Sequence, residues 1–246
     1  MKKLLKITGY SIVILIVAAT IGFFILDEEI PSMKEGIKAD ALAYKMEESL
    51  NKAAFDSTRY FAWNFIGNHQ YYWDKTENKV LVVWGDHEVL LNLNHLNQSS
   101  VKQNGAILVD ENKSELIEKA WKYYCNDSFW LIAPYKSFDA GVSRGMVQNE
   151  DGSESLLVQY SSGGATPGDS YLWHLDENNR PNSFQMWVSI IPVGGIEASW
   201  EDWEEMNGGF YISTKHNLGI ISFGINDLKA GQTIESIGIS ANKMNF

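Results

Sequence analysis

The sequence predicts an α+β fold with one large, curved antiparallel sheet of about eleven strands and a few helices, preceded by one N-terminal transmembrane helix. Three observations predict it. Short apolar segments with a period of two recur between Gly, Asn and Pro turn signals. Two other segments have the 3.6-residue period of a helix. An uncharged run over residues 7–26 stands near the start of the chain.

The uncharged run reads ITGYSIVILIVAATIGFFIL, and an α-helix needs about 20 apolar residues to cross a bilayer. Lys2, Lys3 and Lys6 precede the run and Asp27 follows it. Because positive flanks stay in the cytoplasm, we expect a single-pass protein of the inner membrane whose C-terminal part lies in the periplasm. The expected organisation is an anchor over 1–26, a tether over 27–37 and an extracytoplasmic domain over 38–246.

A cleaved signal peptide is the alternative interpretation of this start. Signal peptides have a shorter apolar core, and a small-residue cleavage site follows it. Here Ala18 and Ala19 lie inside the apolar run, and no such site follows Leu26. The residues therefore favour a retained anchor. A lipid-modified start is not expected, because the single Cys of the chain is Cys125.

Helical periodicity predicts a first helix over 38–55 and a second that begins at Asn112 and stops near Asn126. Between them, alternating segments predict a four-stranded antiparallel meander over residues 61–93, with turn signals such as Gly67-Asn68 and Gly85-Asp86. After the second helix every apolar segment has strand character. These later strands are expected at 128–134, 155–161, 170–176, 183–191, 209–216, 220–225 and 233–239.

Charge and composition exclude several classes of function. The formal net charge is −11, and no run of Lys or Arg follows the predicted anchor. Nucleic-acid binding needs a basic surface, so no nucleic-acid partner is expected. One Cys excludes an internal disulfide framework and Cys-rich zinc sites. The five His have no ligand spacing, and we expect neither a metal nor a cofactor.

The stretch GGATPGDS, residues 163–170, has the spacing of a phosphate-binding loop. In such loops a Lys and several backbone amides bind the phosphates, and a helix follows. Here Asp169 stands at the Lys position, Pro167 lacks an amide donor, and the following YLWHLD has strand character. The stretch therefore predicts a connection between two strands and no nucleotide site.

Acidic and aromatic residues gather in SWEDWEE, residues 199–205. A glycosidase needs two carboxylates facing each other across a cleft, and Glu201 and Asp202, with Asp139 and Asp169 elsewhere, are the available candidates. A solvated acidic surface is the simpler interpretation. No nucleophile motif such as Gly-x-Ser-x-Gly occurs. No catalytic residue is assigned, and an enzyme is the less favoured class.

Three runs of the sequence resemble an uncharacterised family of membrane-anchored or exported bacterial proteins that is common in Bacteroidota. They are NDSFWLIAPYKSFDAG (126–141), LLVQYSSGGATPGDSYLWHLDENNRP (156–181) and MWVSIIPVGGIEASWEDW (186–203). The order of elements also resembles the half-barrel of the periplasmic lipoprotein carriers, the LolA-like fold. That resemblance implies a curved sheet whose concave side holds an apolar ligand, such as a lipid or a lipoprotein acyl chain, under helical lids. It implies no catalytic residues, and a retained anchor departs from a diffusing carrier.

Aromatic residues make up 13% of the chain, with nine Trp. Several predicted strands are apolar on both faces, so one face needs a helix or a ligand to cover it. The sequence thus favours a membrane-anchored extracytoplasmic domain that binds a lipid-like or other apolar ligand. An envelope hydrolase acting on glycan or lipid and a protein-interaction module of the envelope remain the alternatives. The expected ligand-lining residues, each of which also suits a plain core, are Phe61, Trp63, Phe65, Trp84, Trp130, Phe184, Met186 and Val188.

Overall fold

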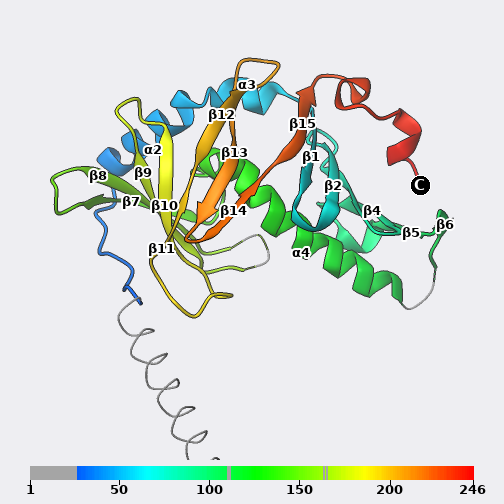
Figure 1. The fold of residues 1–246 in the computed structure, drawn as a ribbon, viewed down its shortest axis with the longest axis horizontal. Helices are drawn as coiled ribbons and strands as arrows, with labels where there is room; N and C mark the ends of the chain where they lie inside the picture. Colours follow the sequence, from blue (N-terminus) through cyan, green and yellow to red (C-terminus); the bar gives the residue numbers. More distant parts are fainter. Residues whose placement is uncertain (1–26, 110–111, 163, 165) are drawn as a thin grey trace, which may run out of the picture.

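The computed structural model describes residues 27–109, 112–162, 164 and 166–246, which form two antiparallel sheets that pack on one long helix (Figure 1). The predicted α+β class is confirmed. The predicted single half-barrel sheet is wrong, because the strands divide into a 7-stranded and an 8-stranded sheet. Neither sheet closes into a barrel within the described ranges.

The first sheet has the strand order β15-β1-β2-β3-β4-β5-β6. Its strands β1 to β4 pair consecutively, as the predicted meander requires, and left-handed residues such as Asn78 (φ 50) and Gly85 (φ 55) make the tight turns. Two short 3-10 turns, η1 (Ile66–Asn68) and η2 (Leu96–Gln98), lie between its strands. The strand bounds are β1 Tyr60–Phe65, β2 His69–Asp74, β3 Lys79–Trp84, β4 His87–Asn92, β5 Ser100–Gln103, β6 Ala106–Ile107 and β15 Asn226–Gly231.

The second sheet has the order β12-β13-β11-β10-β9-β8-β7, with β14 paired to β13. The residues 163–170 connect β8 to β9, which are antiparallel neighbours, so the predicted strand connection is confirmed; Gly163 and Ala165 lie outside the described residues. The bounds are β7 Val142–Gln148, β8 Glu154–Tyr160, β9 Ser170–Leu175, β10 Pro181–Trp187, β11 Ile196–Ser199, β12 Glu201–Glu205, β13 Tyr211–Leu218 and β14 Ile221–Gly224.

The helix α4 spans Asn112–Ile132 and continues into the 3-10 turn η3, Ala133–Tyr135. The strand predicted at 128–134 is therefore wrong, as is the helix end near Asn126. A run such as FWLIA fits a buried strand or a buried helix equally well. The helix forms because its end is covered by both sheets, and its buried positions keep helical spacing from Ile117 and Ala120 to Leu131.

Two other predicted elements also differ in the structure. The helix expected over 38–55 divides into α2 (Ile37–Ser49) and α3 (Lys52–Ser57), because Asn51 has a left-handed φ of 56. The strand expected at 233–239 is the 3-10 turn η4, Ile234–Ile237, and a further turn, η5, spans Ala241–Met244. The strand β7 contains Gly145, which leaves room for Met33.

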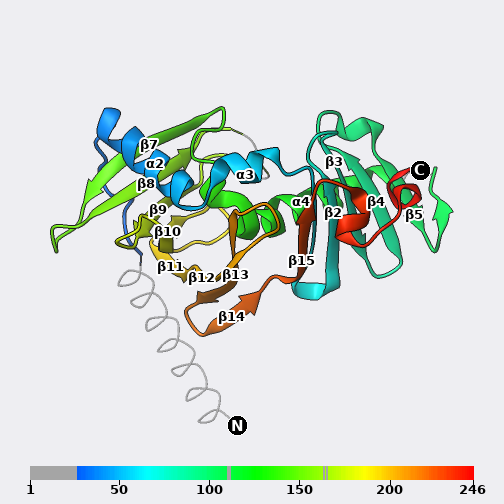
Figure 2. The same ribbon diagram turned by 90° about the horizontal axis from the view of Figure 1, so that it is seen from above.

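The two sheets lie side by side, and α4 runs from one to the other (Figure 2). The helix α2 packs on β7 and β8 of the second sheet. Arg144 of β7 holds this helix, since its Nε donates to Asp40 at 2.8 Å. Glu47 of α2 accepts from the Ser137 hydroxyl at 2.6 Å, and burial raises the pKa of this carboxyl. These polar contacts fix α2 on the second sheet and on the segment between η3 and β7.

The segment predicted as a tether is bound to the second sheet over part of its length. The Glu28 amide donates to the Gly194 carbonyl at 3.2 Å, and the Trp187 indole donates to the Glu28 carbonyl at 2.7 Å. Lys34 forms an isolated bridge with Met146. The predicted anchor, residues 1–26, lies outside the described residues. Within the described ranges, no helix combines the length and the apolar character needed to cross a bilayer.

Candidate functional site

The best candidate site is the apolar layer between α4 and the inner faces of the two sheets. Alternation along β1 places Phe61, Trp63 and Phe65 on one face, and all three are buried. The helix α4 covers this face along its length with residues such as Ile117 and Leu131. Near its C-terminal end, Phe129 and Trp130 also pack against the cluster that contains Phe184 of β10. The helix thus supplies one lid to two sheets.

The structure divides the eight expected ligand-lining residues between two neighbouring clusters. The cluster of the first sheet contains Phe61, Trp63, Phe65 and Trp84. The cluster of the second sheet contains Phe184 and Met186, with Val188 packed against it. Trp130 lies on α4 rather than on a strand and packs against both clusters. The predicted residues are therefore joined through one side chain of the helix.

Trp130 was expected to line the ligand site, but the sequence did not reveal the group of aromatic side chains that surrounds it. Its ring centroid lies 4.8 Å from Phe223, 5.1 Å from His216 and 6.3 Å from Trp200. The alternation of side chains along β13 could have revealed that His216 faces the core. Phe210, Ile212 and His216 lie at even-numbered positions on one face, and all three are fully buried. Its neighbours come from strands distant in sequence, which no local pattern connects.

His216 is held neutral in this group. Burial lowers its pKa to about 4, more strongly than the hydrogen bond to the Ser199 carbonyl raises it. The Nδ1 atom lies 3.1 Å from the Ser199 carbonyl oxygen, so this nitrogen carries the proton of the neutral ring. The ring therefore serves as an apolar wall with one polar edge.

The titration of His216 predicts a pH-dependent stability. Between the ordinary His pKa of 6.5 and the folded-state value of about 4, the unfolded chain binds a proton that the folded chain does not. Stability is therefore full above pH 6.5 and falls as the pH is lowered towards 4, by about 3 kcal/mol at most. Urea unfolding at pH 7 and pH 4 measures the loss. His216→Leu should reduce it by that amount, whereas exposed His95→Gln should leave it unchanged.

Several indole N–H groups in the apolar layer have no hydrogen-bond partner among the described residues. They belong to Trp63 and Trp73 in the first sheet and to Trp173 and Trp200 in the second. A buried donor without a partner costs about 1–3 kcal/mol. The layer thus contains unused donors beside apolar surface, which suits a ligand with an apolar chain and a polar acceptor.

A carboxyl group in the C-terminal half of α4 fastens the helix to the first sheet. Asp127 is 3% exposed, and its Oδ2 accepts from the Tyr71 hydroxyl at 2.5 Å and lies 2.8 Å from His69 Nδ1. Burial, with the neighbouring carboxyl group second, raises the pKa of Tyr71. The His69 ring also stacks on Tyr123 at 4.0 Å. We call Asp127, His69 and Tyr71 the α4 latch, since they are a polar fastening within an otherwise apolar layer.

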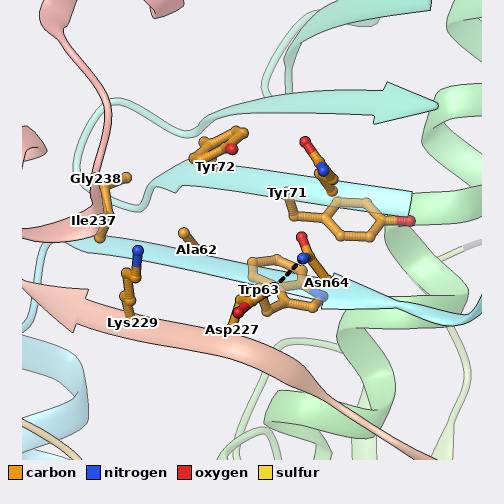
Figure 3. Close-up of a pocket in the computed structure, with 10 residues that line it drawn as sticks. Ala62, Trp63, Asn64, Tyr71, Tyr72, Asp227, Lys229, Ile237 and Gly238 are labelled. Carbon is orange, nitrogen blue, oxygen red and sulfur yellow. Dashed lines mark hydrogen bonds between the residues drawn. The ribbon is translucent and has the colours of Figure 1, made fainter. Parts of the chain in front are cut away.

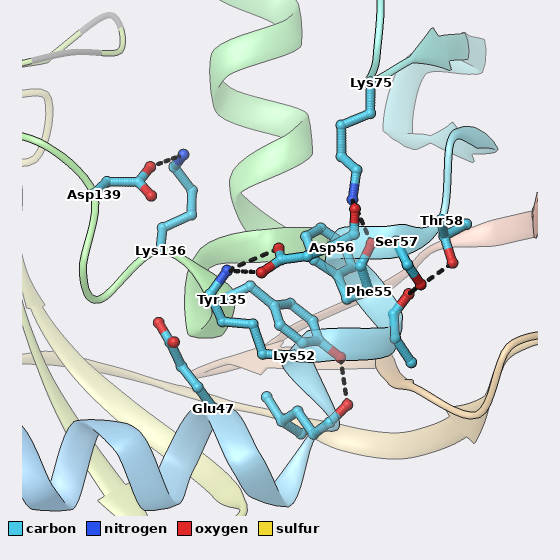
Figure 4. A network of polar contacts seen from close by, with 12 residues as sticks. Glu47, Lys52, Phe55, Asp56, Ser57, Thr58, Lys75, Tyr135, Lys136 and Asp139 are labelled. Carbon is cyan, nitrogen blue, oxygen red and sulfur yellow. Dashed lines mark hydrogen bonds and ion pairs between the residues drawn. The ribbon is translucent and has the colours of Figure 1, made fainter.

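The far end of α4 is fixed where α2 and α3 meet (Figure 4). The Tyr135 hydroxyl donates to the Leu50 carbonyl at 3.0 Å and also to the Tyr211 carbonyl. Its ring stacks on Phe55 at 4.1 Å. Lys75 donates to the carbonyls that end α3, and burial lowers the pKa of Lys75 to about 8. This junction is structural, because its polar groups bind one another.

The carboxylates considered for hydrolysis do not converge. Asp169 is buried and accepts from the Ser189 amide at 3.0 Å and the Thr166 hydroxyl at 2.5 Å. Glu201 binds Asn217 and Lys215, and Asp139 binds Lys136. Each has a local structural partner, and no described contact joins any two of them.

Two further kinds of site are a cysteine nucleophile and a metal centre formed by side chains of the described ranges. Burial raises the pKa of the Cys125 thiol to about 12, so the thiol stays protonated at neutral pH. No group of three or more His, Cys, Asp or Glu side chains in these ranges is arranged to hold a metal ion.

Comparisons with known proteins do not place the chain in a family. No family model matches it, and no curated protein matches it. A solved structure with some likeness is the crystal structure of a DUF1329 family protein from Desulfovibrio piger. It has 9% sequence identity and a TM-score of 0.42, over 84% of this chain and 97% of that chain. At this TM-score the likeness carries no argument about fold or function.

Proposed function

We propose that the chain is a membrane-anchored extracytoplasmic domain that binds a lipid-like or other apolar ligand between α4 and the two sheets. The observation that carries the proposal is the layer itself, where aromatic side chains of both sheets meet under one helix. The apolar run at 7–26 supports the anchor and the inner-membrane location. The resemblance of the sequence to exported bacterial proteins points in the same direction.

Ligand entry requires α4 to move away from a sheet, because the lining residues are packed against it. Apolar contacts resist such a movement in proportion to the area they bury. An acyl chain that replaces the helix restores those contacts, and its ester or carboxylate oxygen accepts from an unpaired indole such as Trp200 Nε1. The ligand therefore compensates the groups that the displaced helix leaves exposed.

Photo-cross-linking tests this proposal. The full chain is reconstituted in vesicles of phosphatidylethanolamine that carry a diazirine on one acyl chain, and labelled peptides are identified by mass spectrometry. Labelling of residues 1–26 reports the anchor and serves as the internal control. We expect further labelling of peptides that contain Trp130 and Phe184. Labelling confined to residues 1–26 would contradict apolar ligand binding.

A matched pair of substitutions sharpens the test. Val188 is half-buried at the edge of the second cluster, and its neighbour Ser189 is exposed. Val188→Trp adds a large ring at the layer and should reduce labelling of the domain severalfold. Ser189→Trp adds the same ring one position away, at an exposed position of the turn that follows β10, and should leave labelling unchanged. Equal effects of the two variants would exclude a ligand in this layer.

A further inference from the structure

A concave site lies on the face of the first sheet opposite the apolar layer (Figure 3). It is an open cavity of about 220 Å³ at β1, β2 and β15, bounded by the η4 turn. Alternation separates it from the apolar layer, because Ala62 and Asn64 point outward where Phe61 and Trp63 point inward. We call this cavity the outer groove.

The outer groove forms because Ala62 is small and because the register between β1 and β15 is irregular. Ala62 is its floor and pairs with Tyr72 on one side and Lys229 on the other. The larger side chains of Tyr72 and Lys229 therefore stand as walls (Figure 3). The pairing of β1 with β15 shifts between Ala62 and Asn64, and Asp227 has a left-handed φ of 51. This bulge directs Asp227 to Asn64, whose amide donates to it at 2.5 Å.

Most polar groups of the outer groove are free to bind a ligand. Lys229, Gln70 and the Tyr72 hydroxyl make no hydrogen bond or ion pair within the described residues. Asp227 uses one carboxylate oxygen for Asn64 and keeps the other. The groove thus offers an ammonium and an amide as donors, and carboxylate and amide oxygens as acceptors, beside the Tyr72 ring. Trp63 and Tyr71 also contribute to its lining.

We propose that the outer groove binds one uncharged sugar ring. A pyranose presents hydroxyl groups around its edge and C–H groups on its faces, and C–H groups pack favourably on the electron-rich face of an aromatic ring such as Tyr72. Asp227 and Lys229 are two residues apart on one strand, about 6–7 Å along it. A hexose bridges that separation with hydroxyls on opposite edges, whereas the ammonium and carboxylate of an α-amino acid lie closer together.

Titration of the full chain in detergent micelles with methyl α-glucoside and N-acetylglucosamine tests the proposal, with saturation-transfer NMR as the readout. We expect weak, saturable binding of at least one of the two sugars. Lys229→Met and Gln70→Ala each remove a donor and should weaken it about tenfold. Lys45→Met removes an exposed ammonium on α2 and should leave it unchanged.

Three outcomes overturn the proposal. The first is no binding of either sugar by the unsubstituted protein up to 50 mM, about the limit of a meaningful affinity. The second is sugar binding that persists in both Lys229→Met and Gln70→Ala, which places the site elsewhere. The third is alanine, a zwitterion, binding as tightly as the sugars with the same sensitivity to Lys229→Met. Circular dichroism of each variant checks that the fold is retained.

Discussion

Replacing Trp130 with alanine is expected to lower the free energy of unfolding by about 3–5 kcal/mol, the range for a large aromatic residue removed from a core. Trp130 packs against the clusters of both sheets, and its ring lies 5.6 Å from Phe184 and 4.8 Å from Phe223. The substitution removes the contact through which α4 joins the two sheets. Urea unfolding followed by circular dichroism measures the loss.

Trp121→Ala is the matched control for Trp130. Trp121 lies on the same helix and is half-buried as well, but it packs only against the cluster of the first sheet. Trp121→Ala should therefore lower the free energy of unfolding clearly less than Trp130→Ala does. If the two variants lose the same stability, Trp130 does not couple the sheets. Trp130→Ala should also leave an apolar cavity, and such cavities bind small apolar molecules.

Replacing Asp127 with alanine is expected to lower the free energy of unfolding by about 3–5 kcal/mol, because two hydrogen bonds to its buried carboxyl group are lost and each contributes about 1.5–3 kcal/mol. The Tyr71 hydroxyl is fully buried and loses its acceptor, and His69 loses the group at 2.8 Å from its Nδ1. Since the α4 latch fastens the helix to the first sheet, α4 should also open more often. Amide hydrogen exchange along α4 measures the opening, and urea unfolding measures the stability.

Glu118→Ala is the control for the α4 latch. Glu118 is exposed on the same helix and pairs with Lys122 at 2.6 Å, a contact worth about 0.5 kcal/mol or less. Asp127→Asn, which keeps one oxygen acceptor, should lie between the two alanine variants. Equal exchange rates in Asp127→Ala and Glu118→Ala would show that the latch does not restrain α4.

The strands that the sequence predicts well are those whose surroundings are local. In β1 to β4, alternation and turn residues such as Asn78 and Gly85 specify each hairpin, and the pairing partner is the next segment of the chain. The burial of Phe61, Trp63 and Phe65 on one face follows from the same alternation. The connection at 163–170 was predictable too. Pro167 and Asp169 disfavour a phosphate-binding loop, and the strand character of the residues that follow indicates a connection between strands.

The elements that the sequence misses depend on distant partners. β15 reads NDLKAG, without the β-branched and aromatic residues that mark strands, and it forms by pairing with β1 far earlier in the chain. The end of α4 looks like a strand because both sheets cover it and every side of the helix can be apolar there. His216 and the α4 latch were missed for the same reason, since their partners come from separate elements.

The sequence by itself determined that this protein is α+β, acidic, rich in buried aromatic rings and built from antiparallel hairpins, because periodicity and turn chemistry act over a few residues. The tertiary structure decided that the strands form two sheets and that α4 packs on both. It also decided which polar groups of α4 and the sheets meet. Those outcomes depend on which apolar face covers which other face. That choice is made by packing across the whole chain, where Trp130 contacts both cores and Asp127 reaches Tyr71.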